Sequence, residues 1–325
     1  MQPVIAVTMG DPAGIGPEIV VKALAEPKVQ KAAFCIICGS RSVLEQACRC
    51  CNISKQVLES DFATVYDVPN LELKDFIFGK VSAACGKAAF SYIEKACHLT
   101  SEGKTQAVVT APINKESLKA ASVPYIGHTE IFASLTSTDD PLTLFEVNNL
   151  RIFFLTRHVS LQKACQMITK ERIKDYVIRC SSALTQLGIK NGTMAIAGLN
   201  PHSGEHGLFG TEELDAIEPA VSQLKSLGYD VAGPISADSV FHQALQGKYN
   251  SVLSLYHDQG HIAAKTYDFE RTISITCGMP ILRTSVDHGT AFDIAWQNKA
   301  SAISMVEAIL TAAKYAPHWN KASLS

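Results

Sequence analysis

The chain has 325 residues, 47% of them hydrophobic and 18% charged, which is enough to bury one large core or two of medium size. This composition excludes intrinsic disorder, and a formal net charge of −2 excludes a general attraction to nucleic acid or membrane surfaces. No apolar run approaches the roughly 18 residues of a membrane span, and no basic flank of an export signal precedes the first apolar run, so we expect a soluble, cytoplasmic protein.

The first part of the chain alternates short apolar runs with longer amphipathic segments. The runs VIAVTMG, FCIICGS and QAVVTAP predict strands at 4–10, 34–40 and 106–112. The amphipathic segments predict helices over 17–26, from about Ser42 onward, and over 86–102. Pro17 suits the first turn of its helix, where no backbone N–H is needed.

The middle of the chain departs from this alternation. LTLFEVNNLRIFFLT, residues 142–156, contains two β-type runs joined through Asn148-Asn149, which predicts a hairpin. One long helix is predicted over 160–187. The remaining segments predict strands at 194–200, 251–257 and 272–278 and helices at 211–228 and 299–315. Strands that alternate with helices indicate an α/β protein with a largely parallel sheet.

Ten cysteines are scattered along the chain at irregular spacings. Cys35 and Cys38 form a C-I-I-C pattern with the spacing of redox or zinc motifs, but they lie in a strand-like run and no matching pair follows. We interpret the cysteines as buried free thiols.

Polar clusters follow the predicted strands or apolar runs at six places. They read TMGDPAGIGPE, TAPINK, TRHVS, GLNPHSGE, LYHDQG and TSVDHGTA. Because ligands bind beyond the carboxyl ends of strands in open α/β sheets, these loops are expected to converge although they are far apart in sequence.

Three histidines in these clusters are candidate metal ligands: His158, His202 and His257. Neutral imidazoles suit Zn²⁺ and similar ions, and three protein ligands leave a position open for substrate. Their separations are long, however, and a histidine at a strand end is also a common structural residue. Asp238 and Asp258 are candidates to orient the imidazoles or to add a carboxylate ligand.

Other residues of these clusters suit an anionic ligand. GDPAGIGPE, residues 10–18, resembles a phosphate loop but lacks the Rossmann and Walker spacings, so a tight strand-to-helix turn is the alternative. In GHTE, Thr129 is expected to cap a helix and His128 to face a ligand. Lys265 and Arg283 supply positive charge, or are solvated surface cations.

Taken together, the clusters closely resemble the 4-hydroxythreonine-4-phosphate dehydrogenase family. The matching strings are GDPAGIGPE, TAPINK, GHTE, GLNPHSGE, GTEE, YHDQG and RTSVDHGTAFDIA, in the family's order from residue 10 to about 295. The resemblance implies an isocitrate/isopropylmalate-dehydrogenase-like fold, with two α/β subdomains in one unit over 1–325, an active-site cleft and a homodimer whose interface holds the active site. It also implies oxidation of a secondary alcohol by NAD or NADP, followed by decarboxylation, which yields 3-amino-2-oxopropyl phosphate for the pyridoxine-pathway substrate.

The resemblance further assigns roles to individual residues. One divalent ion (Zn²⁺, Mg²⁺, Mn²⁺ or Co²⁺) is expected at His158, His202 and His257. Substrate contacts are expected from His128, Thr129, Lys265 and Arg283, and cofactor contacts from Asp287, His288, Gly289 and Thr290. Lys265 is the candidate for proton transfer, with Asp238 and Asp258 as alternatives. Gly260 is expected to let the chain turn beneath His257 and Lys265, while His261 receives no role.

Two positions depart from the family pattern. Ser274 stands where the family usually has a substrate-binding asparagine, and Trp296 stands in a usually glycine-rich segment. The opening TMGDPAGIGPEIVVKAL is closer to a paralogous branch that acts on D-threonate or D-erythronate 4-phosphate and yields dihydroxyacetone phosphate. A phosphate acyltransferase and a non-catalytic sugar-phosphate sensor are the alternatives of other classes.

Overall fold

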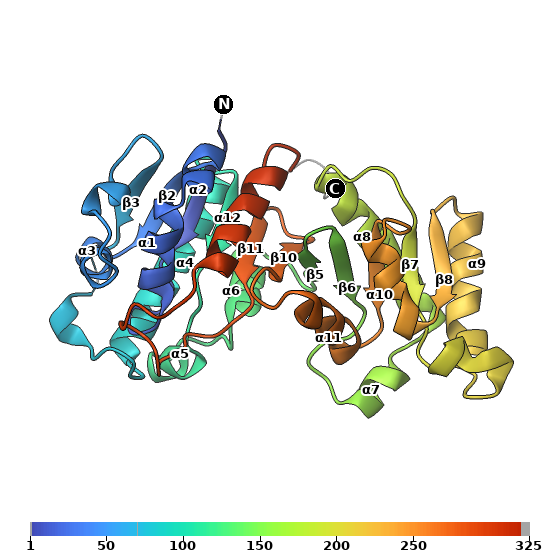
Figure 1. Cartoon of the computed structure of the whole chain (residues 1–325). Coiled ribbons are helices and arrows are strands. Elements are labelled where there is room, and N and C mark those ends of the chain that lie inside the picture. The colour runs from blue at the N-terminus through green and yellow to red at the C-terminus, as the bar shows by residue number, and fades with distance from the viewer. Residues whose placement is uncertain (1, 70, 320–325) are drawn as a thin grey trace. The chain divides into compact units, whose positions relative to one another are not determined.

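The computed structural model describes residues 2–69 and 71–319 and divides the chain into two compact units. Unit 1 consists of residues 1–141 and 273–325, and unit 2 of residues 142–272. In each unit, helices cover both faces of the strands, so the α/β prediction is confirmed (Figure 1).

Within unit 1, neighbouring strands are parallel in every pair but one. Its spatial order is β3 (Ala63–Asp67), β2 (Phe34–Gly39), β1 (Val4–Thr8), β4 (Ala107–Thr110), β11 (Leu282–Val286) and β10 (Ile273–Cys277). Only β10 runs antiparallel to its neighbour within this unit, in the register Ser274 opposite Ser285. The central strands β1 and β4 are almost wholly buried, as is usual for parallel strands covered on both faces.

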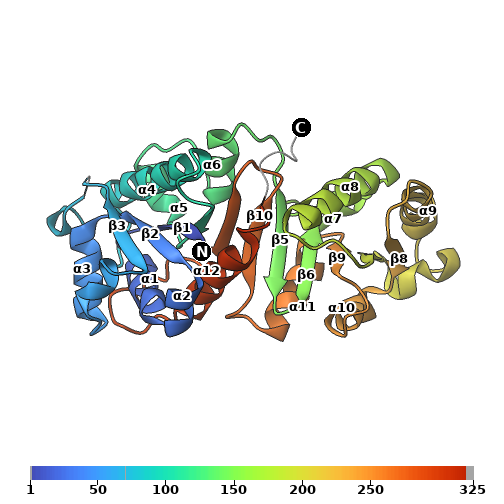
Figure 2. The ribbon, with the colours of Figure 1, turned by 90° about the horizontal axis from the view of Figure 1, so that it is seen from above.

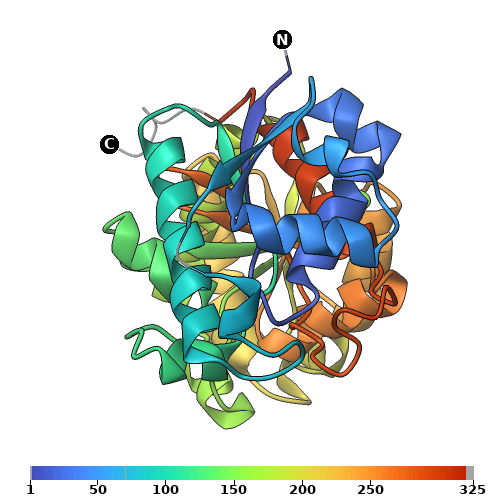
Figure 3. The ribbon, with the colours of Figure 1, turned by 90° about the vertical axis from the view of Figure 1, so that its left-hand side faces the viewer.

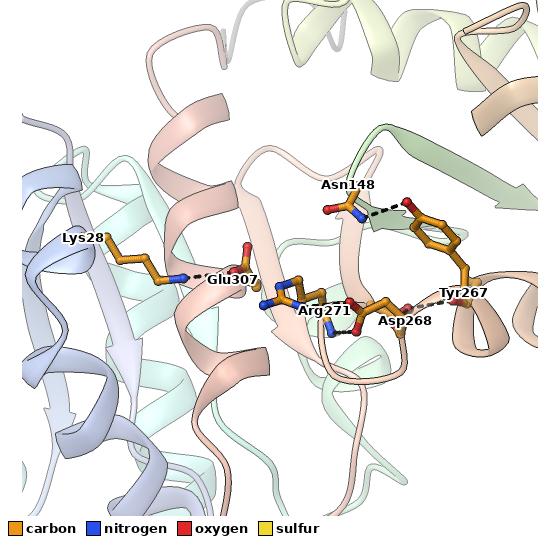
Figure 4. Close-up of polar contacts among 8 residues, drawn as sticks. Lys28, Asn148, Tyr267, Asp268, Arg271 and Glu307 are labelled. Atoms are coloured by element: carbon orange, nitrogen blue, oxygen red, sulfur yellow. Dashed lines mark hydrogen bonds and ion pairs between the residues drawn. The ribbon is translucent and has the colours of Figure 1, made fainter. Parts of the chain in front are cut away.

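Helices cover both faces of this sheet (Figure 2). One face carries α4 (Ala83–Ser101), α5 (Lys115–Ala120) and α6 (His128–Leu135). The other carries α1 (Gly16–Ala25), α2 (Pro27–Ala32), α3 (Arg41–Cys50) and α12 (Ile303–Tyr315). Figure 3 views the unit from its β3 edge and separates α4 from α3. An ion pair of 3.2 Å between Lys28 Nζ and Glu307 Oε1 joins α2 to α12 (Figure 4).

Unit 2 combines a hairpin with three parallel strands. Its spatial order is β5 (Leu142–Val147), β6 (Leu150–Phe154), β9 (Ser251–Ser254), β7 (Met194–Ala197) and β8 (Val231–Ile235). β5 and β6 are antiparallel and are joined through Asn148, which has a left-handed φ of 52°. Asparagine tolerates this conformation better than most residues because its short side chain bonds locally.

The helices of unit 2 also lie on both faces of the sheet (Figure 2). α8 (Lys170–Gln186) and α9 (Glu218–Ser226) cover one face, and α10 (Ala237–Leu245) and α11 (His257–Tyr267) cover the other. A π-helical turn, Glu213–Ile217, leads directly into α9, and the short helix α7 (Leu161–Gln166) follows β6. The core on the α10 and α11 side includes Phe145, Ile152, Phe154 and Val252.

The single helix predicted over 160–187 is wrong, because the segment forms α7 and α8 with a break at 167–169. The Ser160 hydroxyl accepts a hydrogen bond from Lys163 N and caps α7. The Thr169 hydroxyl accepts from Arg172 N and starts α8 afresh. A side chain that caps a helix start satisfies backbone donors that a continuous helix would pair internally, so each cap favours a new beginning.

The turn predicted at Gly260 is also wrong, because α11 begins at His257 and Gly260 lies within it. A Cβ atom there would lie 2.6 Å from Phe154 Cε1 and 2.8 Å from Ile152 Cγ2. Glycine is therefore required by close packing of α11 on β6. The far end of α11 is held by the Asn148–Tyr267 hydrogen bond and the Arg271–Asp268 ion pair (Figure 4).

All ten cysteines are free thiols. Burial raises the pKa of Cys35 and of Cys38 to about 12, so neither is a reactive thiolate. Among the described residues, no helix is long and apolar enough to cross a membrane.

Candidate functional site

Unit 2 brings two of the three candidate histidines to one cavity. His158 follows β6 and His257 opens α11, with their ring centroids 5.9 Å apart. They line a cavity of about 300 Å³ with Arg157, Tyr256 and Asp258 among its other walls. The carboxyl ends of β6 and β9, which are parallel neighbours, explain this convergence.

The ring of His257 is fixed by its neighbours. Its Nδ1 lies 2.6 Å from Asp258 Oδ1, and its ring stacks on that of His261 at 3.6 Å. His261 Nδ1 also bonds the His257 carbonyl at 2.8 Å and packs against Phe145 and Phe154. With Nδ1 engaged, Nε2 of His257 is the nitrogen available to a ligand. His261, which received no role from the sequence, supports the ring; its spacing of four residues from His257 was the available signal.

His202 lies on a separate loop of unusual backbone. Residues 202–206 all have positive φ, from 42° to 81°, within the segment Pro201–Gly207. Consecutive left-handed residues are costly for L-amino acids and persist only where the surroundings hold them. The exposed His202 ring lies 6.5 Å from that of Phe209, and it does not line the cavity shared by His158 and His257.

Glu213 holds this loop from beneath. Its buried carboxylate accepts hydrogen bonds from Leu199 N at 2.7 Å, Asn200 N at 2.8 Å and Asn200 Nδ2 at 2.8 Å. A Cβ at Gly204 would lie 2.8 Å from Glu213 Oε2, so the loop wraps closely around the acid. The sequence pattern predicted only a helix over 211–228 and gave no sign that Glu213 holds the loop.

Imidazole chemistry fits a divalent ion at the His158–His257 cavity, with the Asp258 carboxylate orienting one ring. Within the described ranges, the one set of three ligand-type side chains whose atoms all lie within 4.8 Å is a different one: Glu18, Cys50 and Cys51. That set is a poor metal site. Both Glu18 oxygens already accept backbone N–H groups, and burial raises the pKa of both thiols. The structure therefore pairs two of the three candidate histidines and leaves His202 apart.

The candidate proton-transfer residues also belong to unit 2. Asp238 and Asp258 are exposed and line a second cavity of about 600 Å³ beside α10 and α11. Lys265 lies on α11, half-buried, with Nζ 5.3 Å from the centre of the Phe269 ring.

Unit 1 contains a buried cation that has no carboxylate partner among the described residues. Arg283 on β11 is 4% exposed, and its guanidinium donates to the Thr110 hydroxyl at 2.9 and 3.2 Å and to the Thr276 hydroxyl at 2.9 Å. Its Cζ lies 5.3 Å from the Phe132 ring centre. Burial lowers the pKa of Arg283 to about 9, while the Glu130 charge acts in the opposite direction. The hydroxyls that it contacts are neutral, so the Glu130 charge alone offsets its own at a distance, and this condition favours the binding of an anion.

His128 stands beside this cation at the start of α6. Burial, and secondarily the Arg283 charge, lower the pKa of His128 well below its usual range, so the imidazole is neutral. Its Nε2 is buried without a hydrogen-bond partner. The capping role expected of Thr129 is wrong, because Gly127 occupies the N-cap position and no side chain caps α6. The uncapped backbone N–H groups are donors that suit the same anion, and Nε2 joins them in the tautomer that carries its proton there.

Ser274 and the 287–290 loop lie in unit 1 as well. Ser274 is half-buried on β10, opposite Ser285 of β11. Thr290 is buried: its carbonyl accepts from Ile15 N at 3.0 Å, and its side chain would meet a Cβ at Gly14 at 2.8 Å. The other three residues of the loop, Asp287, His288 and Gly289, remain at least partly exposed. The loop is thus seated on the turn that opens α1.

Trp296 locks the segment after this loop to the same turn. It has a left-handed φ of 63°, and its indole N–H donates to Pro12 O at 3.1 Å. Its ring stacks on Phe78 at 4.1 Å, and its backbone N–H donates to Glu18. These contacts offset the strain of a large residue in a backbone conformation that glycine adopts more easily.

Asp11 is a titratable residue of the same turn that the sequence reading did not single out. It is fully buried, and Oδ1 accepts from Ala13 N at 2.9 Å while Oδ2 has no partner. Burial raises the pKa of Asp11 to about 6, against weaker opposing effects of its hydrogen bonds.

Comparisons with known proteins agree on one family. The family model of the pyridoxal phosphate biosynthetic protein PdxA matches residues 30–312. A Clostridium botulinum protein named "Putative D-threonate 4-phosphate dehydrogenase" is 58% identical over 98% of this chain and 99% of its own length. Crystal structures of 4-hydroxythreonine-4-phosphate dehydrogenases from Klebsiella pneumoniae and Burkholderia phymatum are 39% and 37% identical, with TM-scores of 0.88 and 0.84. Each covers 97% of this chain and 98% of the other.

Proposed function

Since the chain belongs to the PdxA family and is a dehydrogenase, we propose that it oxidises and decarboxylates a phosphorylated four-carbon hydroxy acid. The first candidate is D-threonate 4-phosphate, because the 58% identical relative carries that name over nearly its whole length. The second is 4-hydroxy-L-threonine 4-phosphate, the substrate in the names of the 37–39% identical structures.

The buried Arg283 guanidinium is the observation that carries this proposal. A cation held by the hydroxyls of Thr110 and Thr276 is a receptor for the substrate's phosphate or carboxylate. The orphaned Nε2 of neutral His128 adds a donor without adding a competing charge. Thr129, in the first turn of α6, completes the proposed set in unit 1.

In unit 2, His158, His202 and His257 would hold one divalent ion, and the orientation of His257 by Asp258 supports this assignment. Such an ion supplies Lewis-acid polarisation of the substrate oxygens in both chemical steps. Coordination would use the nitrogen lone pair that a neutral imidazole offers. Zn²⁺, Mg²⁺, Mn²⁺ and Co²⁺ all remain candidates.

Lys265 is the proposed proton-transfer residue, with Asp238 and Asp258 as the alternatives. An ammonium on α11 stabilises the negative charge that develops as CO₂ leaves, and it has a proton to deliver to the resulting carbanion. The two aspartates line the cavity of about 600 Å³ beside α10 and α11 and would act as carboxylate bases instead.

The dehydrogenase family implies a nicotinamide cofactor, which would supply the acceptor for the hydride of the alcohol carbon. We place NAD or NADP at Asp287, His288, Gly289 and Thr290. The seating of Thr290 on the α1 turn supports this placement, since it fixes a partly exposed loop at its end. Ser274 would then contact the substrate with a single hydroxyl where an asparagine offers an amide.

We further propose a cytoplasmic homodimer whose active site combines residues of two subunits. A mixing experiment tests the dimer. Two inactive variants, His257→Ala and Arg283→Met, are unfolded, mixed equally and refolded together. Recovery to about a quarter of wild-type activity is expected if each active site takes His257 from one subunit and Arg283 from the other. Sedimentation at the monomer mass would contradict the dimer.

The function itself is tested by following the absorbance of reduced nicotinamide. D-threonate, D-erythronate and 4-hydroxy-L-threonine 4-phosphates are compared with each metal and with NAD and NADP. A clear preference for a sugar-acid phosphate assigns the chain to carbon catabolism, and a preference for the amino acid assigns it to pyridoxine synthesis. The absence of nicotinamide reduction with every substrate would contradict the proposal and favour a sugar-phosphate sensor or an acyltransferase.

A further inference from the structure

Gln259 is a buried glutamine in the YHDQG segment, two residues after His257. Gln259 is 9% exposed, and both the oxygen and the nitrogen of its side-chain amide form hydrogen bonds. Oε1 accepts from Leu255 N at 2.7 Å, and Nε2 donates to the Gly198 carbonyl at 2.8 Å. Because Leu255 and Gly198 are themselves buried, neither backbone group has water as a ready substitute partner.

The two backbone groups lie where neighbouring strands end. Leu255 directly follows β9 and Gly198 directly follows β7, and these strands are parallel neighbours with Ile196 opposite Leu253. The register of these two strands ends at this pair. Beyond it, one segment leads to the loop that carries His202 and the other to the start of α11, where His257 lies. The Gln259 amide therefore continues the connection between the two chains one step beyond the sheet.

A residue that is held by a hydrogen bond lies two positions before each of the three candidate ligands in the sequence. Thr156, two residues before His158, donates from its hydroxyl to the Leu255 carbonyl at 2.9 Å. Leu255, two residues before His257, donates to Gln259. Asn200, two residues before His202, donates to the Glu213 carboxylate. Gln259 is the side chain in this chain of contacts that joins the β9 end to the β7 end.

We propose that Gln259 is a positioning residue for the divalent-cation site, which sets the spacing between the segments that present His202 and His257. This inference rests on the proposed function, in which those histidines bind the ion. The physical reason is that an ion tolerates small errors in ligand position poorly, and residues that orient ligands typically affect metal affinity about 10- to 100-fold. A loop of left-handed residues, such as 202–206, has no regular hydrogen-bond ladder of its own to provide that accuracy.

The test compares Co²⁺ binding by the metal-free full-length variants, measured by calorimetry and by the visible absorption spectrum of the bound ion. Gln259→Glu keeps the acceptor for Leu255 N but replaces the donor to Gly198 O with an oxygen. Gln259→Met keeps the approximate volume and removes both bonds. Gln246→Glu, an exposed glutamine on the same unit, is the matched control.

Both Gln259 variants are expected to bind Co²⁺ about 10- to 100-fold more weakly than wild type and with an altered spectrum, while the control matches wild type. Gln259→Glu is expected to affect His202-dependent coordination while leaving the β9 end tethered, so its defect is the smaller. If both variants bind Co²⁺ with wild-type affinity and spectrum, Gln259 only stabilises the fold and the inference is overturned.

Two further measurements keep the inference separate from the proposed function. If wild type binds no Co²⁺, or if His257→Ala binds it as wild type does, the histidine metal site itself is wrong. If a Gln259 variant fails to fold by circular dichroism, Thr156→Val tests the same tethering at the next strand end. This variant removes the bond to Leu255 O at nearly constant volume, and normal Co²⁺ binding by it would overturn the tethering of these loops.

Discussion

The candidate sites of the two units are built in opposite ways. In unit 1 the central residue, Arg283, lies on a strand inside the core and is fixed by hydroxyls of neighbouring strands. In unit 2 the candidate ligands are exposed or half-buried, at the ends of strands, and the buried residues are those that hold the backbone beneath them, Glu213 and Gln259. A charge that must act strongly is thus buried and preformed, whereas ligands that must reach an ion are kept accessible and are positioned indirectly.

The largest expected effect comes from removing an imidazole of unit 2. His257→Ala is expected to lower kcat by at least about 10³-fold, because Lewis-acid polarisation supplies several kcal/mol to the barrier. Steady-state assays measure the loss of activity, and analysis of bound metal by mass spectrometry measures the loss of the ion. His98→Ala, at an exposed position of α4, is the control. Full activity of a metal-free His257→Ala enzyme would contradict the metal site.

The buried cation of unit 1 gives the next largest effect. Arg283→Lys is expected to lower kcat/KM by about 10²-fold, because an ammonium cannot reproduce the forked contact with an oxyanion. The variant should still bind Co²⁺ normally in unit 2, which separates the two sites. Arg271→Lys, at an exposed ion pair with Asp268, is the matched control. An unchanged kcat/KM for Arg283→Lys would remove Arg283 from substrate binding.

The energetic cost of burying a charge in unit 1 can be measured at Asp11 by varying the pH. Its folded-state pKa of about 6 exceeds the usual 3.8, so ionisation is disfavoured in the folded state. The associated stability is fully present below about pH 4 and is lost as the pH rises through 6. Asp11→Asn cannot ionise, so its stability relative to wild type should rise by about 2 kcal/mol between pH 4 and pH 7. Urea unfolding at both pH values measures this difference, and a constant difference would show that the Asp11 pKa is normal.

The smallest effect concerns the packing that carries His257. Gly260→Ala is expected to destabilise the fold by about 1–3 kcal/mol, because the added methyl group would overlap Phe154 and Ile152. Gly103→Ala is a useful comparison, since no atom lies within 4 Å of its added Cβ and only its positive φ is strained. Thermal unfolding of both variants measures the effect. A smaller loss for Gly260→Ala than for Gly103→Ala would show that α11 shifts away easily.

The sequence by itself determined the α/β class and the hairpin at Asn148, because these depend on local periodicity and on turn residues. It also named candidate site residues, whose roles stay predictions. It did not determine the break between α7 and α8, where two caps outweigh a continuous helical pattern. Nor did it determine that Gly260 lies within a helix, since the contact that requires glycine involves strand residues a hundred positions away.

Only the tertiary structure decided which polar residues act together. Glu213 and Gln259 are ordinary residues in sequence, and their importance arises from backbone groups at strand ends that the fold brings within hydrogen-bond distance. The burial of Arg283 and Asp11, which lowers one pKa and raises the other, likewise depends on atoms contributed by distant segments. Sequence patterns report local geometry and side-chain chemistry, whereas desolvation and long-range hydrogen bonds exist only once the chain has folded.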